Sequence, residues 1–207
     1  MDQPVIPIDF SAVRKALTDN KIILFLYALM IASVAVGPCL YRTYFFKKVS
    51  DGFSALCITA MKSESTVYIF LFCLILYLAV TAVAYVSGIS AAGFVIAPAA
   101  LSAFGLGLGA VAAHFYSGYG LKGLLFCLAV IFPTALAESV GLILSVRESV
   151  VFSLMIRKAF SSKHEPMNFA ADYKVYCLRY VFISCISVAA SLVGTASVRI
   201  FFKMFEI

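Results

Sequence analysis

Glu138 is the residue of this sequence whose type and position most suggest chemistry. Between Val67 and Val146 only Lys122 and Glu138 are charged, so Glu138 is an acid inside a long apolar stretch. A carboxylate at such a depth is costly in lipid and normally faces the interior of a helix bundle or a water-filled cavity. Two interpretations stay open: a buried polar lock or relay, and a partly solvated residue near the end of a span.

The neighbours of Glu138 limit what this group could do. Pro133 lies five residues before it and Thr134 lies one helical turn before it. A proline removes one backbone hydrogen bond and kinks a helix, which frees a carbonyl for other partners. A proton-coupled carrier usually has a second buried ionisable group, and His114 is the candidate that the sequence offers.

Signatures of membrane enzymes do not occur in the sequence. It has no HExxH motif, no phosphate-binding loop and no aspartate within a predicted span, and neither His114 nor His164 has an evident serine partner. The cysteines form no CxxC pair and no Cys/His metal spacing. A disulfide between Cys39 and Cys57 stays open if their segment faces an oxidising compartment. We therefore predict no enzymatic activity, no catalytic residue, no cofactor and no metal site. The six cysteines are Cys39, Cys57, Cys73, Cys127, Cys177 and Cys185.

A ladder of small residues is the second feature with a physical meaning. Gly105 and Gly109 are four residues apart, and such spacing lets two helix backbones approach closely in lipid. The ladder either packs within the bundle or forms a face for self-association or for a partner helix. It is not a nucleotide-binding loop, because no strand precedes it. The ladder consists of Ala99, Ala103, Gly105, Gly107, Gly109 and Ala113.

The composition of the chain indicates whether it folds in water or in lipid. The chain has 207 residues, of which 63% are hydrophobic and 13% charged, and its mean hydropathy is +1.04. A soluble chain of this length could not bury so much apolar surface, so lipid is the expected solvent. The net charge is +6, but the basic residues lie in connecting segments, which is typical of topology signals and of contact with lipid headgroups. We therefore expect no nucleic-acid partner.

Apolar runs of about 20 residues, the length needed to cross a bilayer core about 30 Å thick, predict an all-α bundle of five spans. The count becomes six if residues 149–160 dip into the bilayer. Pro98 interrupts the third span, and Pro133 lies near the middle of the fourth. A short surface helix is expected over 53–62 and an amphipathic helix over 148–160. The predicted spans of this single membrane domain, 1–207, are 22–41, 67–86, 91–115, 121–145 and 175–198, and the polar loops are 42–66 and 146–174.

The first residues predict how the chain enters the membrane. Residues 7–21 carry apolar side chains at helical spacing with basic residues between them, which predicts an interfacial amphipathic helix; a mobile tail is the alternative. No apolar signal-peptide core precedes the first span, so that span is expected to stay as an uncleaved anchor. With the N-terminus inside, nine Lys and Arg residues lie inside and seven outside, which favours this orientation.

The order of these segments resembles the stage II sporulation protein M family of polytopic membrane proteins. The likeness covers nearly the whole chain and is strongest between residues 91 and 144. There the sequence resembles the family in the glycines from Gly105 to Gly109, in the turn near Gly120, and in Pro133 followed by Glu138. Many members have a histidine and a glycine after the proline. This chain has Thr134 and Ala135 instead, so no role of that histidine is carried over.

The resemblance implies a non-catalytic scaffold in the bacterial plasma membrane. Family members are similar to an anchor that recruits peptidoglycan-degrading partners to septal membranes during engulfment in endospore formation. Membrane lipids and other membrane or envelope proteins, peptidoglycan hydrolases among them, are then the expected partners. Their binding surfaces would be the small-residue face of the third span and the two polar loops. The alternative is a permease or channel subunit with Glu138 near its path, because Pro98 and Pro133 could mark broken helices at a midplane site.

Overall fold

The computed structural model of the protein describes residues 21–161 and 169–205, and these residues are helical almost throughout, with no strand among them. Four of the helical stretches are long and apolar enough to cross a membrane. Their outward side chains suit lipid, since Leu24, Ile31 and Ile75 are each more than 65% exposed. The predicted all-α architecture is therefore confirmed for the described residues. The four stretches are Lys21–Leu40, Thr66–Ile89, Gly93–Ala159 and Ala171–Phe202.

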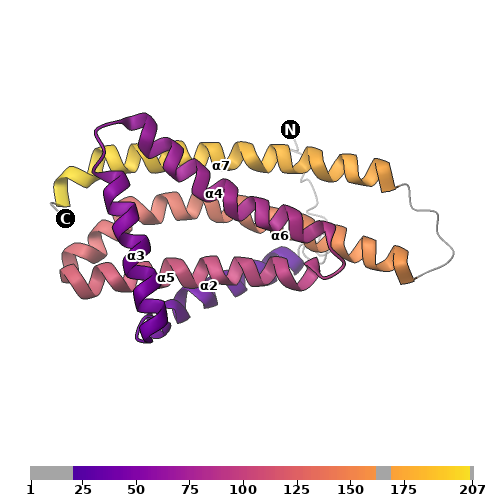
Figure 1. Ribbon diagram of the computed structural model, residues 1–207, viewed down its shortest axis with the longest axis horizontal. Helices are drawn as coiled ribbons and strands as arrows, with labels where there is room; N and C mark the ends of the chain where they lie inside the picture. The colour runs from indigo at the N-terminus through magenta and orange to yellow at the C-terminus, as the bar shows by residue number, and fades with distance from the viewer. Residues whose placement is uncertain (1–20, 162–168, 206–207) are drawn as a thin grey trace, which may run out of the picture.

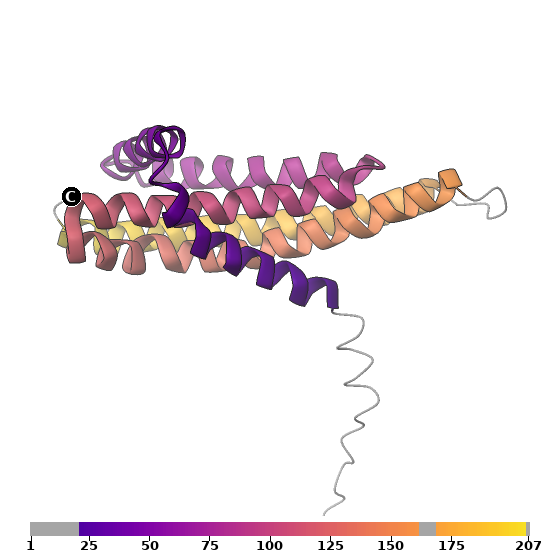
Figure 2. The ribbon, with the colours of Figure 1, turned by 90° about the horizontal axis from the view of Figure 1, so that it is seen from below.

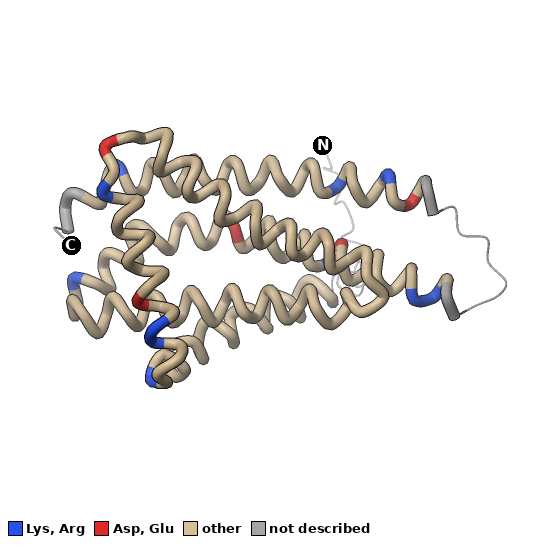
Figure 3. The backbone as a smooth tube through the Cα atoms, viewed as in Figure 1, with Lys and Arg blue, Asp and Glu red and all other residues tan. Residues whose placement is uncertain are grey.

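Five helices run roughly along the long axis, and one lies across an end (Figure 1). Figure 2 shows the same bundle from below, with α2 crossing it obliquely. Charged residues gather towards the two ends (Figure 3), as expected if the middle of the bundle lies in lipid. The long helices are α2 (Lys21–Leu40), α4 (Thr66–Ile89), α5 (Gly93–Phe126), α6 (Phe132–Ser161) and α7 (Phe169–Phe205), and the transverse helix is α3 (Tyr44–Met61).

The transverse helix α3 occupies most of the predicted polar loop 42–66. The short helix expected over 53–62 instead begins at Tyr44, so Tyr44, Phe45 and Phe46, which follow the first span, belong to α3. Its apolar residues Phe46, Phe53 and Cys57 share one face at helical spacing, whereas Lys48 and Asp51 lie on other faces. This amphipathic pattern suits a helix that lies in the plane of the membrane surface.

The stretch Gly93–Ala159 reverses direction at Gly120. This residue has φ 59° and ψ −135°, a backbone conformation that glycine adopts without a Cβ clash. The rings of Phe115 and Phe126, on either side of the reversal, have centroids 5.0 Å apart, so the two arms pack against each other. The reversal therefore falls at the turn expected near Gly120, between the predicted spans 91–115 and 121–145, and the helix of the third span continues past 115 to reach it.

A π-helix, η1 (Cys127–Ile131), precedes Pro133. The proline has no amide hydrogen and its ring crowds the carbonyl four residues earlier, so the helix widens there instead of keeping regular α-helical bonds. The sequence predicted the distortion near Pro133 but not its form. In this bundle the distorted turn lies in the core, with Val130 buried against Phe115 and Phe126.

Helices α6 and α7 both extend beyond the spans predicted for them. The amphipathic helix predicted over 148–160 is the continuation of α6, and α7 is longer than the predicted span 175–198. The part of the predicted loop 146–174 that precedes Ser161 is therefore helical. Residues 1–20 and 162–168 lie outside the described part of the chain, and with them lies the amphipathic helix predicted over 7–21, apart from Lys21.

Of the three apolar clusters among the described residues, two join four elements each. The first joins α2, α4, α5 and α6 through fully buried side chains such as Leu26, Leu101 and Leu142. The second lies nearer to α3 and joins α4, α5, η1 and α7 through Ile69 and Phe115. Each cluster contains residues from at least four elements, so the bundle described here packs as one unit around Glu138.

Candidate functional site

Glu138 lies in the interior of the bundle, between α6 and α7. Its side chain is fully buried, and its Oε1 accepts a hydrogen bond of 3.2 Å from Ser187 Oγ on α7. Its Oε2 has no hydrogen-bond partner among the described residues. Of the two interpretations of Glu138, the structure matches the buried polar group, because a residue near the end of a span would reach the surface. A buried carboxylate oxygen without a hydrogen-bond donor is rare in folded proteins, so the missing donor of Oε2 needs an explanation.

Pro133 and Thr134 shape the helix just before Glu138. Thr134 is buried and its Oγ1 donates to Val130 O at 3.2 Å, within the turn that Pro133 distorts. The Thr134 side chain also packs on Gly194 of α7, where an added Cβ would lie 2.8 Å from Thr134 Cγ2. The close approach of α6 and α7 at this point brings Ser187 within reach of Glu138.

A second polar group lies further along the same pair of helices. Tyr180 Oη on α7 is 2.6 Å from Ser149 Oγ and donates to Ser145 O at 2.8 Å. All three side chains are buried. The fully buried side chains of Leu142 and Ile143 come between this group and Glu138 along α6, and no hydrogen bond between described residues joins the two. Glu138 with Ser187, and Tyr180 with Ser145 and Ser149, are therefore separate polar groups in the interior.

Glu148 continues the polar series towards the end of the bundle. Its two carboxylate oxygens pair with Arg147 Nη1 at 3.0 Å and with Arg179 Nη1 at 2.5 Å. Glu148 itself is buried, so the two guanidinium groups cover it from outside. Arg179 lies inside the predicted fifth span, where no partner was expected for it. Its spacing from Glu148 in the sequence is 31 residues, which no local pattern reveals.

His114 does not serve as the second ionisable group for Glu138. Its Nδ1 lies 2.7 Å from Asp51 Oδ1, and Tyr41 Oη lies 3.2 Å from the same oxygen. These three residues come from α5, α3 and the position directly after α2, so they attach the transverse helix to the bundle. Asp51 was not singled out in the sequence, because its partner lies 63 positions away.

The glycine ladder packs within the molecule. An added Cβ on Gly105 would lie 2.9 Å from Ser33 Cβ of α2, and one on Gly109 would collide with Val34 O. Gly37 of α2 completes the contact, since its Cβ would lie 2.8 Å from Gly109 Cα. Of the two interpretations of the ladder, the intramolecular one therefore describes Gly105 and Gly109. Gly37 was missed because it is a lone glycine with no ladder of its own.

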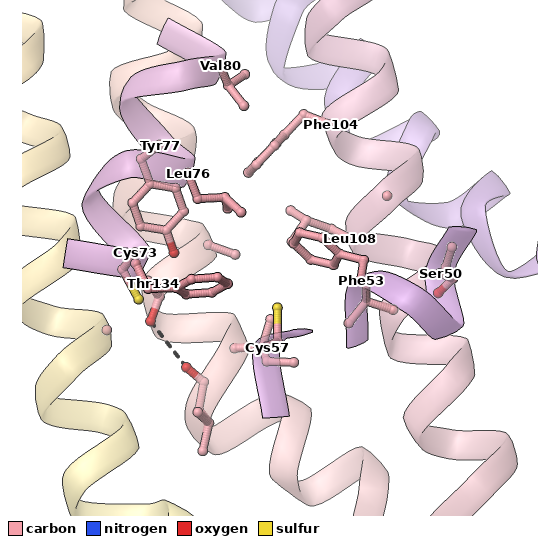
Figure 4. Close-up of a pocket in the computed structure, with 18 of the residues that line it drawn as sticks. Ser50, Phe53, Cys57, Cys73, Leu76, Tyr77, Val80, Phe104, Leu108 and Thr134 are labelled. Atoms are coloured by element: carbon pink, nitrogen blue, oxygen red, sulfur yellow. Dashed lines mark hydrogen bonds between the residues drawn. The ribbon is translucent and has the colours of Figure 1, made fainter. Parts of the chain in front are cut away.

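Ala103 and Gly107 belong to a different face of α5 from Gly105 and Gly109. Gly107 and Ala103 are exposed, and Ala113 is half-buried. A Cβ added to Gly107 would meet no atom within 4 Å. Gly107 and Ala103 line a cavity of about 690 Å³ between α3, α4 and α5, which Figure 4 shows in close-up. Thr134 and Tyr77 also line it, so the cavity reaches the helix turn next to Glu138.

Metal chemistry has no support among residues 21–161 and 169–205, where no three His, Cys, Asp or Glu side chains gather into a potential metal site. All six cysteines are free thiols, so no Cys39–Cys57 disulfide is present in this structure.

The described fold and its buried carboxylate define an all-α protein whose long apolar helices are those of a multi-pass membrane protein. Comparison of the chain with protein-family models, curated proteins and solved structures found no match. The relation to the stage II sporulation protein M family stays a prediction from the residues quoted above.

Proposed function

We propose that the chain is a non-catalytic scaffold in a bacterial plasma membrane, where it positions other membrane or envelope proteins. The observation that carries this proposal is the projecting end of the α6–α7 pair. Ser153 Oγ donates to Ser90 O and accepts from Phe94 N, so the α4–α5 turn lies beside Ser153. Helix α6 continues to Ser161, which adds about 12 Å at 1.5 Å per residue.

The projecting end presents charged groups beyond the apolar bundle. Both helices extend past the α4–α5 turn (Figure 1), and α7 carries Asp172 and the exposed Lys174 there. Arg157 of α6 instead lies over the ring of Phe94, with Cζ 5.1 Å from the ring centroid. A rigid pair of helices with mixed charge suits a docking surface, since electrostatic complementarity directs association. The family resemblance adds peptidoglycan hydrolases as the expected class of partner. The basic residues favour the inside for this end of the bundle, and the wall lies outside, so the projecting end would bind the membrane-anchoring segment of such a hydrolase.

The topology that we propose has five crossings. The stretch Gly93–Ala159 contains 67 residues, which would span about 100 Å if straight, more than three times the thickness of a bilayer core. Its reversal at Gly120 supports two crossings in place of one. The N-terminal end of α2 and the α6–α7 end then share one side, for which the basic residues favour the inside, while α3 and the end of α7 share the other.

The test is recovery of partners from crosslinked native membranes with the tagged protein, followed by mass spectrometry. Lys174→Glu changes the charge of the projecting end, and Lys48→Glu is the matched change on exposed α3 at the other end. We expect envelope proteins such as wall hydrolases to be recovered with wild type and Lys48→Glu, and to be reduced with Lys174→Glu. Equal recovery of background proteins by all three chains would contradict the scaffold.

A permease or channel subunit is the second candidate, and one observation favours it. Glu138 has an unpaired oxygen and lies one helical turn from Thr134, which lines the cavity. In this case Glu138→Gln would abolish transport while leaving the fold intact, and the crosslinked partners would be an ATPase or a second permease subunit. A scaffold keeps its partners in the same variant.

A further inference from the structure

The cavity beside α3 has the character of a binding site for a long apolar group. Its volume of about 690 Å³ falls within the usual range for small-molecule sites. Its walls come from α3, α4 and α5, with η1, α6 and α7 contributing behind them (Figure 4). The lining is almost entirely apolar, as Phe53, Leu76, Phe104 and Leu108 illustrate. Water has few partners in such a space, so an apolar occupant is favoured.

The cavity is open towards the surroundings of the bundle. Val49 of α3 and Ile75 of α4 both line it and are 56% and 66% exposed. On the α5 side, Ala103 and Gly107 line it and are also exposed. Because α4 and α5 belong to stretches that are long and apolar enough to cross a membrane, this opening faces the hydrocarbon of the bilayer.

Helix α3 closes one end of the cavity and contributes the hydroxyl of Ser50 to its wall. Ser50 lies on the α3 wall, is 5% exposed, and its hydroxyl has no hydrogen-bond partner among the described residues. Buried hydroxyl groups are nearly always hydrogen-bonded, so a bound molecule is expected to supply the missing partner of Ser50. Lys47, three residues before Ser50, is exposed on the same helix. The apolar lining suits an acyl chain, and the hydroxyl of Ser50 and the cation of Lys47 at one end suit an ester carbonyl and a phosphate. This is the order of groups in a phospholipid.

We propose that the α3–α4–α5 cavity binds one acyl chain of a bilayer glycerophospholipid, with Ser50 donating to the ester carbonyl of that chain and Lys47 near the phosphate. A partner transmembrane helix fits this cavity poorly, because α3 lies across its end and a straight helix could not continue past it. A flexible chain enters sideways between α3 and α4 and ends below its own headgroup. This site depends on membrane insertion alone and not on the scaffold role.

The test uses the full chain in vesicles of phosphatidylethanolamine and phosphatidylglycerol that contain a trace of phospholipid with a photoactivatable diazirine in its acyl chain. After illumination, crosslinked residues are located by mass spectrometry. We expect adducts to concentrate on cavity-lining residues such as Phe53, Leu76 and Leu108. Adducts spread evenly over the outward apolar residues of all helices would overturn the proposal.

Filling the cavity gives a matched comparison. Gly107→Phe places a ring in the cavity, and Gly118→Phe makes the same change outside it, on a glycine that also has open space around its Cβ. We expect the yield of cavity adducts to fall about tenfold with Gly107→Phe, because the ring takes the space of the acyl chain. They should be unchanged with Gly118→Phe. Equal adducts in both variants would overturn the proposal.

Two further test variants, Ala103→Leu and Ser50→Ala, keep the experiment decisive if Gly107→Phe fails to fold. Ala103→Leu fills the cavity from the same helix, and Ala99→Leu, one turn earlier and outside the lining, is its control. Ser50→Ala should lower cavity adducts about two- to tenfold, the effect of one hydrogen bond. If adducts fall with neither Ala103→Leu nor Ser50→Ala, the crosslinked lipid is not held in this cavity and the proposal is wrong.

Discussion

At the scale of single residues, Ser187 gives the buried carboxylate of Glu138 its hydrogen bond. Ser187→Ala removes this donor and leaves both oxygens unpaired. We expect the variant to lower the free energy of unfolding by about 1 kcal/mol, the usual effect of one such bond, including bonds between membrane helices. Denaturation by sodium dodecyl sulfate in mixed micelles measures the change.

The matched control for this prediction is Ser184→Ala on the same helix. Ser184 Oγ donates to Tyr180 O within α7, so its loss leaves no carboxylate oxygen without a donor. We expect a smaller effect there. Equal losses in the two variants would mean that the bond from Ser187 to Glu138 contributes nothing specific to stability.

Cys57 on α3 offers a prediction about pH. Burial raises the pKa of the Cys57 thiol to about 12, with a smaller contribution from Cys73 nearby. Thiolate is the reactive form, so at pH 8 only about one thiol in 10⁴ is ready to react, and the reaction speeds up as the pH rises towards 12. We expect iodoacetamide to modify Cys57 slowly at pH 8 in the folded protein and readily after denaturation. Rapid modification at pH 8 in the folded protein would contradict this burial.

At the scale of helices, the contact between α2 and α5 depends on Gly37 and Gly109. Gly109→Leu forces a side chain into the α2 backbone, whereas Gly107→Leu points into open space. We expect the first to lower the free energy of unfolding by about 3 kcal/mol or more and the second by much less. The comparison is made in the same denaturation assay. A tolerated Gly109→Leu would show that α2 does not dock closely on α5.

The long helices were predictable from the sequence because apolar runs and the charges that end them are local signals. The predicted starts of the first two spans lie one residue from those of α2 and α4. The position of α3 was not predictable, since the contact of Asp51 with His114 joins distant segments. The apolar surroundings of Glu138 left a buried and a partly solvated position open, and only the structure shows that it is fully buried. Its partner Ser187 was not predictable, because nothing in a run of α7 serines distinguishes one. The cavity depends on the angle at which α3 crosses the bundle, which no periodicity encodes.

At the scale of the whole molecule, the reversal at Gly120 decides the topology. With five crossings, Lys48 follows one crossing and Lys174 follows four, so the two lie on opposite sides of the membrane. If Gly93–Ala159 crossed only once, Lys174 would follow three crossings and would share a side with Lys48. The membrane sides on which Lys48 and Lys174 lie therefore show whether the chain reverses within the bilayer at Gly120.

Single cysteines report these sides in whole cells. Lys48→Cys and Lys174→Cys are made separately in a chain whose six native cysteines are replaced by serine or alanine, and intact cells are treated with a membrane-impermeant maleimide. We expect exactly one of the two positions to be labelled before lysis, Lys48→Cys if the N-terminus lies inside, as the basic residues favour. Lys62→Cys, at the end of α3, is the control and should follow Lys48→Cys. Labelling of Lys48→Cys and Lys174→Cys together would exclude five crossings, and with them the placement of the α6–α7 end on the side of the N-terminus.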